Sequence, residues 1–336
     1  MKVRSTFFLF LFISCGLALS FCSCEDSENI LPPNTGRYAE ILIVADSATW
    51  AGSVGEKIKF LYSEPYPLLT KQEPYFKLIP FLPSQFSEIL KTHRNIIIIN
   101  AEEKQDNSIK IKENLWAQDQ HLLVINIQNE DELLARIDKQ KKDLFNYFYL
   151  ADLERQAAYY RSNALDYFSS YIETTKGINI PIPKDFVTVS DSTDFFWLMR
   201  DKAHLSEHIF YYEEDYVSKE QLTLNHIIKT RNKLGKARIF GEIKDSYMST
   251  ETRFPDVFPL MDTISVSGQF GLRTRGWWKM ENDFLGGYFI RYTLVDERRA
   301  KVVHVETALY CPKYDKMFYL RTLESVLNGI EFSTLN

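Results

Sequence analysis

Cysteine is scarce in this chain, and its distribution excludes a disulfide framework. Only four cysteines occur among 336 residues. Three of them, Cys15, Cys22 and Cys24, lie at the very start, and Cys311 stands alone near the end. An exported domain held by disulfides needs an even set of cysteines within its folded body. The body must therefore hold together by its core alone, or pair with something outside itself. Aromatic residues for a core are abundant, with 24 Phe and 19 Tyr in the whole chain.

Excess positive charge is also missing. Forty Lys and Arg against 45 Asp and Glu give a net charge of −5 at pH 7. A general nucleic-acid-binding protein would carry a basic surface, so we expect no nucleic acid among the partners. The motifs G-x-S-x-G, H-E-x-x-H and G-x-G-x-x-G do not occur in the sequence. These are signatures of hydrolases, metalloproteases and dinucleotide-binding proteins, and we expect no cofactor.

The first two dozen residues are the most informative segment. Lys2 and Arg4 precede an almost unbroken apolar run from Phe7 to Phe21, which is typical of a secretory signal peptide. An uncleaved transmembrane helix is the alternative, but it needs roughly 20 consecutive apolar residues, and small and polar residues interrupt this run. We therefore predict a signal peptide over residues 1–23.

The apolar run ends in Phe-Cys-Ser-Cys-Glu-Asp. A small residue directly before a cysteine at this place resembles a bacterial lipobox, although Phe21 stands where Leu is usual. Ser23 precedes Cys24, whereas Cys15 and Cys22 lie within the apolar run. We therefore predict that cleavage makes Cys24 the acylated first residue, which ties the protein to a lipid bilayer.

A polar, proline-containing segment follows the predicted anchor. Residues 24–36 are expected to form an extended tether that does not pack. The acidic residues directly after Cys24 resemble the surface-export signals of Bacteroidota lipoproteins. We expect a protein of the cell envelope, lipid-anchored in the outer membrane and facing either the periplasm or the outside. Cleavage would also remove two cations and lower the net charge from −5 to −7.

The remaining residues, about 310, exceed the usual size of a single core, which predicts two domains. In the first, short apolar runs alternate with helical patterns, which indicates an α/β layer. Ser53 and Glu56 form a capping-box pattern at the start of one helix. We predict strands over 40–45, 75–82, 95–100, 109–116 and 121–127, and helices over 53–63 and 83–90.

A long helical pattern comes next, with apolar residues at steps of three and four from Leu133 to Ile172. Lys176-Gly177 supplies a basic last turn and a C′ glycine. The pattern predicts either two helices with a bend near Ala151 or one long spine. We place the domain boundary at its end, which gives domains over 37–176 and 177–336.

The second half predicts an antiparallel sheet with flanking helices, so the fold class is α+β. Alternation of apolar and polar residues predicts one face in the core. We predict strands over 187–189, 195–199, 208–212, 264–280, 288–295 and 302–310, and helices over 222–234 and 317–327. The order of elements is similar to that of the PsbP/Mog1-type sandwich.

Several strings along the chain resemble one family, the Bacteroidota lipoproteins grouped as domain of unknown function 4837. The resemblance implies an exported, lipid-anchored protein over nearly the whole mature chain, and it implies no activity and no catalytic residues. The strings are Thr92–Asn95, Trp116–Gln118, Asp245–Thr250, Arg275–Lys279, Asp283–Gly287 and Tyr310–Lys313.

The string His204-Leu-Ser-Glu207-His208 matches the spacing H-x-x-E-H of inverzincin metalloproteases. There both histidines bind zinc from one helix face and the glutamate acts as the base. Here the string lies between two predicted strands, where turn or strand geometry would scatter the side chains. We predict a polar loop and no metal site. A zinc-dependent envelope hydrolase using His204 and His208 as ligands is the alternative.

The polar face of the second sheet is the strongest candidate for a ligand site. We expect six residues to share it: Arg273, Arg275, Lys279, Arg291, His304 and Glu306. The arrangement requires a hairpin that places Arg291 opposite Glu306. Several cations on rigid strands could hold an anionic ligand. The alternative, which we favour, is a solvated or helix-covered face with an ordinary cross-strand ion pair.

With no catalytic constellation in view, the sequence favours a binding role. We predict a non-catalytic envelope lipoprotein that binds an unknown envelope protein or ligand.

Overall fold

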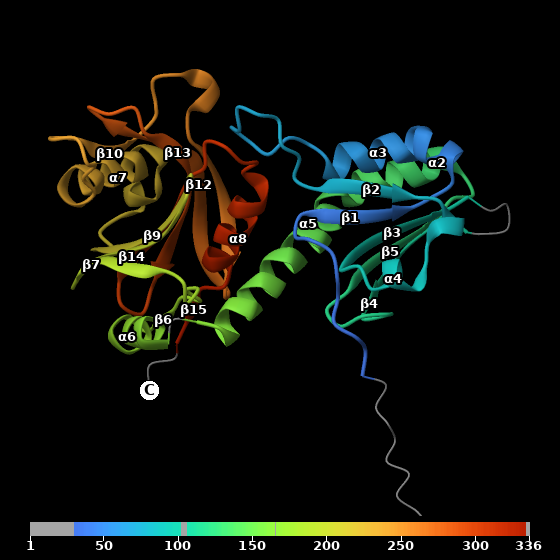
Figure 1. Ribbon diagram of the computed structural model, residues 1–336, viewed down its shortest axis with the longest axis horizontal. Coiled ribbons are helices and arrows are strands. Elements are labelled where there is room, and N and C mark those ends of the chain that lie inside the picture. The colour runs from blue at the N-terminus through green and yellow to red at the C-terminus, as the bar shows by residue number, and fades with distance from the viewer. Residues whose placement is uncertain (1–29, 102–105, 165, 334–336) are drawn as a thin grey trace, which may run out of the picture.

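A computed structural model describes residues 30–101, 106–164 and 166–333, which form two lobes joined by a long helix (Figure 1). The predicted signal peptide and Cys24 lie outside the described residues. Among the described helices, none is long and apolar enough to cross a membrane.

The first lobe is built on a five-stranded sheet with the order β2-β1-β3-β5-β4. Its strands are β1 (Glu40–Val44), β2 (Lys77–Phe81), β3 (Asn95–Asn100), β4 (Ser108–Glu113) and β5 (His121–Asn126). β4 runs antiparallel to β5 at one edge, and the other neighbours are parallel. The apolar runs of the central strands suit a sheet covered on both faces. The predicted α/β layer is confirmed.

Helices cover both faces of this first sheet. They are α2 (Ser47–Ala51), α3 (Ser53–Tyr62), the 3-10 turn η1 (Pro83–Gln85) and α4 (Glu88–Lys91), together with the first part of α5. α3 and α5 pack on one face and α4 on the other. The predicted capping box at Ser53 is wrong, because α2 ends directly before it and Gly52 takes the N-cap position.

The long helix α5 (Glu130–Ser162) connects the lobes and is followed by α6 (Asp166–Lys176). The division into two helices considered near Ala151 is not found there, since α5 stays helical through this residue over its 33 residues. The chain leaves the helix at Asn163 instead. Gly177, with a φ of +64°, ends α6 as predicted. The second part of α5 packs against α8 (Met317–Asn328) of the second lobe (Figure 1).

The second lobe holds an antiparallel sheet with the order β10-β12-β13-β14-β9-β8-β7, in which β11 also pairs with β12. The strands are β7 (Val187–Ser192), β8 (Phe195–Lys202), β9 (Leu205–Asp215), β10 (Tyr247–Thr250), β11 (Leu260–Val266), β12 (Gln269–Glu281), β13 (Gly286–Asp296) and β14 (Lys301–Tyr310). The single strand predicted over 264–280 is wrong. Ser267 and Gly268, with φ of +48° and +76°, form a two-residue turn, which the alternating pattern concealed.

Both faces of this second sheet are buried. α6 and α8 pack on one face, and α7 (Leu224–Arg238) lies on the other. The remaining elements are β6 (Ile178–Asn179), η2 (Lys219–Leu222), η3 (Pro255–Val257) and β15 (Glu331–Phe332). The alternation of apolar and polar residues along these strands therefore does not separate a buried face from a solvent-exposed one. It separates two faces that are each covered by helices. The α+β class is confirmed.

The described end of the predicted tether packs against the first lobe. Pro33 bridges to Gln118 and Thr35 to His93 in parallel fashion. The Thr35 carbonyl also accepts from the Arg94 N–H at 2.9 Å. The expectation that residues 24–36 do not pack is wrong for this part, because its backbone pairs beside the amino ends of β3 and β5.

Candidate functional site

The string His204-x-x-Glu207-His208 lies on the β8–β9 hairpin. His204 occupies the turn with a φ of +62°, whereas Glu207 and His208 belong to β9, where successive side chains point to opposite faces. Glu207 accepts from Arg200 Nε at 2.7 Å, and His208 Nδ1 accepts from Trp197 Nε1 at 3.2 Å. The three side chains diverge, so the string does not bring them to one point as a zinc site requires.

The register of β12, β13 and β14 divides the predicted ligand face into two. Arg291 lies opposite Glu306, as predicted, but Thr274 of β12 lies opposite Arg291 on the other side. Residues directly opposite each other share a face. Arg291, His304 and Glu306 therefore point toward α7, and Arg273, Arg275 and Lys279 point toward the opposite face. The six residues do not form one surface.

Under α7, Glu306 lies between two arginines. Its carboxylate accepts from Arg231 Nη2 at 2.8 Å and from Arg291 Nε at 2.9 Å. Burial raises the pKa of Glu306, but the two guanidinium groups outweigh this effect and hold the pKa below its ordinary value. The adjoining hollow measures about 10 Å³, which is room for one water at most. This cluster is closed to a ligand.

His304 lies beside this cluster and is completely buried. Its Nε2 is 3.3 Å from Glu214 and its Nδ1 is 3.0 Å from the Thr293 hydroxyl. The ring stacks on Tyr212 with 4.3 Å between centroids. Burial lowers the pKa of His304 to about 4. The imidazole is therefore neutral at pH 7 and does not provide a cation. Its contacts with Thr293 of β13 and Glu214 of β9 link β14 to both neighbouring strands.

On the opposite face, the arginines are neutralised from α8 and β11. Arg273 donates to Glu324 at 2.7 Å and to Asp262 at 2.5 Å. Arg275 donates to the Tyr75 hydroxyl at 3.0 Å and lies 3.4 Å from Asp262. Two carboxylates thus balance two guanidinium groups. Lys279, nearer the sheet edge, pairs with Glu281 at 2.8 Å. These ion pairs lie within the fold and leave neither arginine without a carboxylate nearby.

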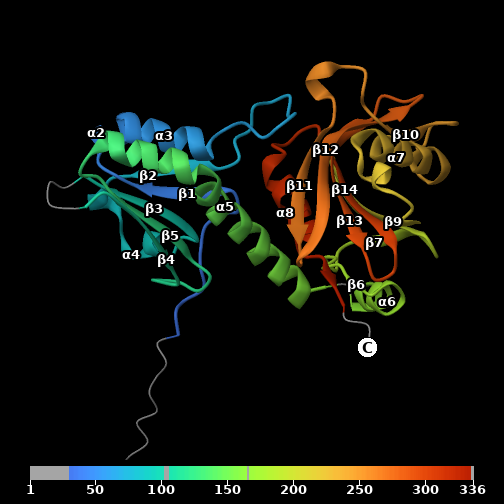
Figure 2. The same cartoon turned by 180° about the vertical axis from the view of Figure 1, so that it is seen from behind.

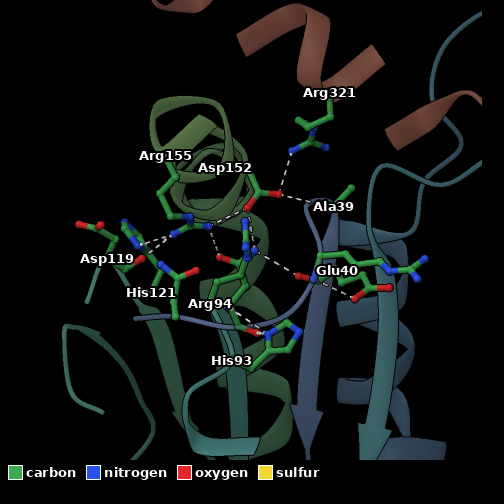
Figure 3. Close-up of polar contacts among 12 residues, drawn as sticks. Ala39, Glu40, His93, Arg94, Asp119, His121, Asp152, Arg155 and Arg321 are labelled. Atoms are coloured by element: carbon green, nitrogen blue, oxygen red, sulfur yellow. Dashed lines mark hydrogen bonds and ion pairs between the residues drawn. The ribbon is translucent and has the colours of Figure 1, made fainter. Parts of the chain in front are cut away.

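A third cluster joins the two lobes around Asp152, which α5 places in the interior (Figure 3). Asp152 accepts from the Ala39 N–H at 2.8 Å, from Asn95 Nδ2 at 3.0 Å and from Arg155 at 2.6 Å. Arg321 of α8 approaches the same carboxylate to 3.5 Å. One side chain therefore holds the starts of β1 and β3, helix α5 and the second lobe together.

Arg155 extends this cluster to the surface (Figure 3). Its Nη1 donates to the Asp119 carbonyl at 2.8 Å and lies 3.0 Å from His121 Nδ1. A guanidinium can only donate, so His121 Nδ1 accepts and the ring is neutral, with its proton on Nε2. Burial, together with Arg155, lowers the pKa of His121, in agreement with this assignment.

A groove of about 1320 Å³ runs along α5, and Asp119, His121 and Arg155 are among the residues that line it. One wall is β4 and the opposite wall is the β11–β12 turn of the second lobe. Two apolar side chains of the groove are strongly exposed, Ile111 at 58% and Leu150 at 49%. The groove thus combines apolar contact area with the polar groups of Asp119, His121 and Arg155, and it is the candidate functional site.

Sequence reasoning missed both the Asp152 cluster and this groove. A signal for Asp152 was present, since this acidic residue lies one turn after Phe148 on the apolar face of α5, beside Leu153. A lone acid at such a position needs a buried cation. Arg155 follows Asp152 at a spacing of three residues on the same helix, but Arg321 lies more than 160 residues further along, and no spacing pattern links it to Asp152.

Two families of unknown function match this chain. Residues 166–329 match the model described as Domain of unknown function (DUF4837), and residues 34–161 match the one described as Domain of unknown function (DUF8532). The resemblance drawn from the strings of the second half is thus supported there. Thr92–Asn95 and Trp116–Gln118 lie in the part that matches the other model. No curated protein matches the chain.

Proposed function

We propose that this protein is an exported envelope lipoprotein of the Bacteroidota type, anchored through an acylated Cys24 in the outer membrane, whose two-lobed body binds a partner without catalysing a reaction. The anchor follows from the sequence alone: a basic start, an apolar run and a small residue before Cys24. The binding role follows from the arrangement of charge and apolar surface.

The observation that carries the binding role is that arginines neutralise the buried carboxylate in each of the three polar clusters. Glu306, Glu324 and Asp152 are each buried and hold arginines in ion pairs, so these charges support the fold and are not directed at a substrate. The open groove along α5 instead exposes apolar side chains such as Ile111 and Leu150. Exposed apolar surface in a groove is typical of a protein-binding site.

Acylation is tested with the full chain in cells supplied with an alkyne-labelled fatty acid. The wild-type protein should incorporate the label and lose residues 1–23, as measured by gel fluorescence and by mass spectrometry of the N-terminal peptide. Cys24→Ser should remain unlabelled and unprocessed. Cys22→Ser, which changes the neighbouring cysteine, is the matched control and should behave like the wild type.

A labelled and processed Cys24→Ser variant would contradict the proposed anchor. Labelling that disappears in Cys22→Ser instead would move the anchor to that residue.

A further inference from the structure

Strand β4 leaves one side of its backbone open. β5 is its single described strand neighbour, so β4 forms an edge of the first sheet. The Tyr147 hydroxyl donates to the Lys112 carbonyl at 2.9 Å and accepts from the Leu122 N–H at 3.2 Å. The backbone groups of Lys112 therefore point toward β5. Because these directions alternate along an antiparallel strand, the N–H and C=O groups of Ile109, Ile111 and Glu113 point outward.

The two edges of the first sheet differ. The outer strand on the other side, β2, contains Pro80, which has no N–H to offer to a further strand. β4 contains no proline and has the sequence SIKIKE. An added strand is therefore disfavoured along β2, whereas the backbone of β4 accommodates one.

The open edge of β4 borders the groove along α5. Ile109 and Ile111 line it from the strand, and Leu150 lines it from the helix. The groove follows α5 from Gln140 to Arg161, about 30 Å at 1.5 Å per residue. The β11–β12 turn of the second lobe closes the far side, where it approaches the last turns of α5 (Figure 2). This length suits an extended chain segment.

The charges on the two faces of β4 differ in sign. On the groove side, Asp119 and Asp143 have no ion-pair partner among the described residues, whereas the cations are occupied. Arg155 pairs with Asp152 at 2.6 Å, and Arg161 pairs with Glu154 at 3.0 Å and with Glu331 at 3.1 Å.

On the other face of the sheet, Lys110 and Lys112 are exposed. They lie opposite Val124 and Leu122, which face the α4 side of the sheet. Side chains of a strand added beside β4 would alternate between these two environments.

We propose that β4 binds an extended peptide segment of a partner protein by strand addition. The segment has apolar and basic side chains on the groove face, which contact Ile109, Ile111 and the free carboxylates, and acidic side chains on the other face, beside Lys110 and Lys112. The inference rests on the proposed binding role and specifies the partner. Backbone hydrogen bonds supply the affinity, and the alternating side chains supply the specificity.

A phage-displayed library of short random peptides, selected against the full chain purified in detergent, tests the proposal. The enriched peptides should show the alternating pattern of apolar or basic residues with acidic ones. A labelled copy of an enriched peptide is then titrated against wild type and variants. Ile111→Pro removes one outward N–H and leaves the bonds to β5 intact, so it should weaken binding at least about tenfold.

Two further variants separate loss of binding from loss of fold. Ile111→Asp places a charge in the apolar part of the groove and should also weaken binding, while Ile111→Val keeps the shape and should bind like the wild type. The urea midpoint of each variant establishes that it is folded. Amide exchange of Ile109, Ile111 and Glu113 should slow when peptide is added.

Three outcomes would overturn the proposal. They are a library with no enriched peptide, a peptide whose affinity is unchanged in Ile111→Pro, and a dimer of this chain that Ile111→Pro dissociates, which would make a second copy the occupant. None of these results alters the labelling of Cys24, so a failed anchor and a failed peptide site remain distinguishable.

Discussion

At the scale of single residues, buried charge stabilises this protein only where each group has its partner. Asp152, Glu306 and Glu324 are almost or completely inaccessible, and each carboxylate is held by arginines. The desolvation of such groups is costly, and removing one partner leaves the other uncompensated in the interior. Glu306 and His304 are the two side chains at which this requirement is tested.

The first concerns Glu306→Gln, which leaves Arg231 and Arg291 without a negative partner. We expect the free energy of unfolding to fall by about 3–5 kcal/mol, measured by urea denaturation at pH 7. Asp215→Asn is the control, because its pair with Lys301 is exposed and should contribute less than about 1 kcal/mol. Equal effects of the two substitutions would show that the buried cluster is not stabilising.

The second prediction concerns the loss of stability at acidic pH. Burial lowers the pKa of His304 to about 4, below the value of about 6.5 in an unfolded chain. The unfolded state therefore binds the extra proton between these values, and stability present above pH 6.5 is lost as the pH falls. We expect His304 to account for a loss on the order of 2 kcal/mol between pH 7 and 5.

Urea denaturation of His304→Gln at both pH values measures this contribution. The variant should lose less stability than the wild type on acidification. An identical loss in both proteins would assign the acid sensitivity to other groups.

At the scale of elements, the close contact between α7 and β10 sets a strict limit on side-chain size. A Cβ added to Gly235 would lie 2.0 Å from the Met248 carbonyl oxygen. Gly235→Ala in a helix ordinarily stabilises by about 0.5–1 kcal/mol. Here we expect a loss of several kcal/mol, since α7 must move off the sheet.

The thermal midpoints of Gly235→Ala and of Lys233→Ala, an exposed position on the same helix, provide the measurement. Only the glycine substitution should lower the midpoint. A stabilised Gly235→Ala protein would mean that the helix is free to shift.

Most elements followed from local patterns, and the exceptions have physical causes. β3 (Asn95–Asn100) matches its predicted bounds because an isolated run of isoleucines between polar residues fits only a buried strand. The β11–β12 turn was not predicted, because the two residues Ser267 and Gly268 keep the alternation of apolar and polar residues in phase from one strand to the next. The six polar residues of the second sheet were assigned to one face although they lie on two. The register of the strands and the helices that cover each face depend on contacts between segments far apart in the sequence, which local patterns do not contain. The groove along α5 requires both lobes, and no local pattern contains it.

At the scale of the whole molecule, Asp152 is the joint between the lobes, since it holds Ala39 of the first and Arg321 of the second. We expect Asp152→Asn to lower stability by about 3–5 kcal/mol and to uncouple the lobes. In calorimetry, the variant should show a broadened or split transition where the wild type shows one.

Asp143→Asn, an exposed change on the same helix, should leave the transition unchanged. If Asp152→Asn melts in a single transition at the wild-type temperature, the other contacts between the lobes, such as the packing of α5 on α8 and the hydrogen bond from Arg275 to the Tyr75 hydroxyl, suffice to couple them.

The short backbone pairing of Pro33 and Thr35 with the first lobe also has a consequence for orientation. With Cys24 acylated as proposed, the chain from Cys24 to Pro32 can span at most about 27 Å. This segment meets the body beside Gln118, the residue before Asp119, which lines the groove. The lipid would then keep Pro33, and with it this part of the first lobe, within about 27 Å of the bilayer surface.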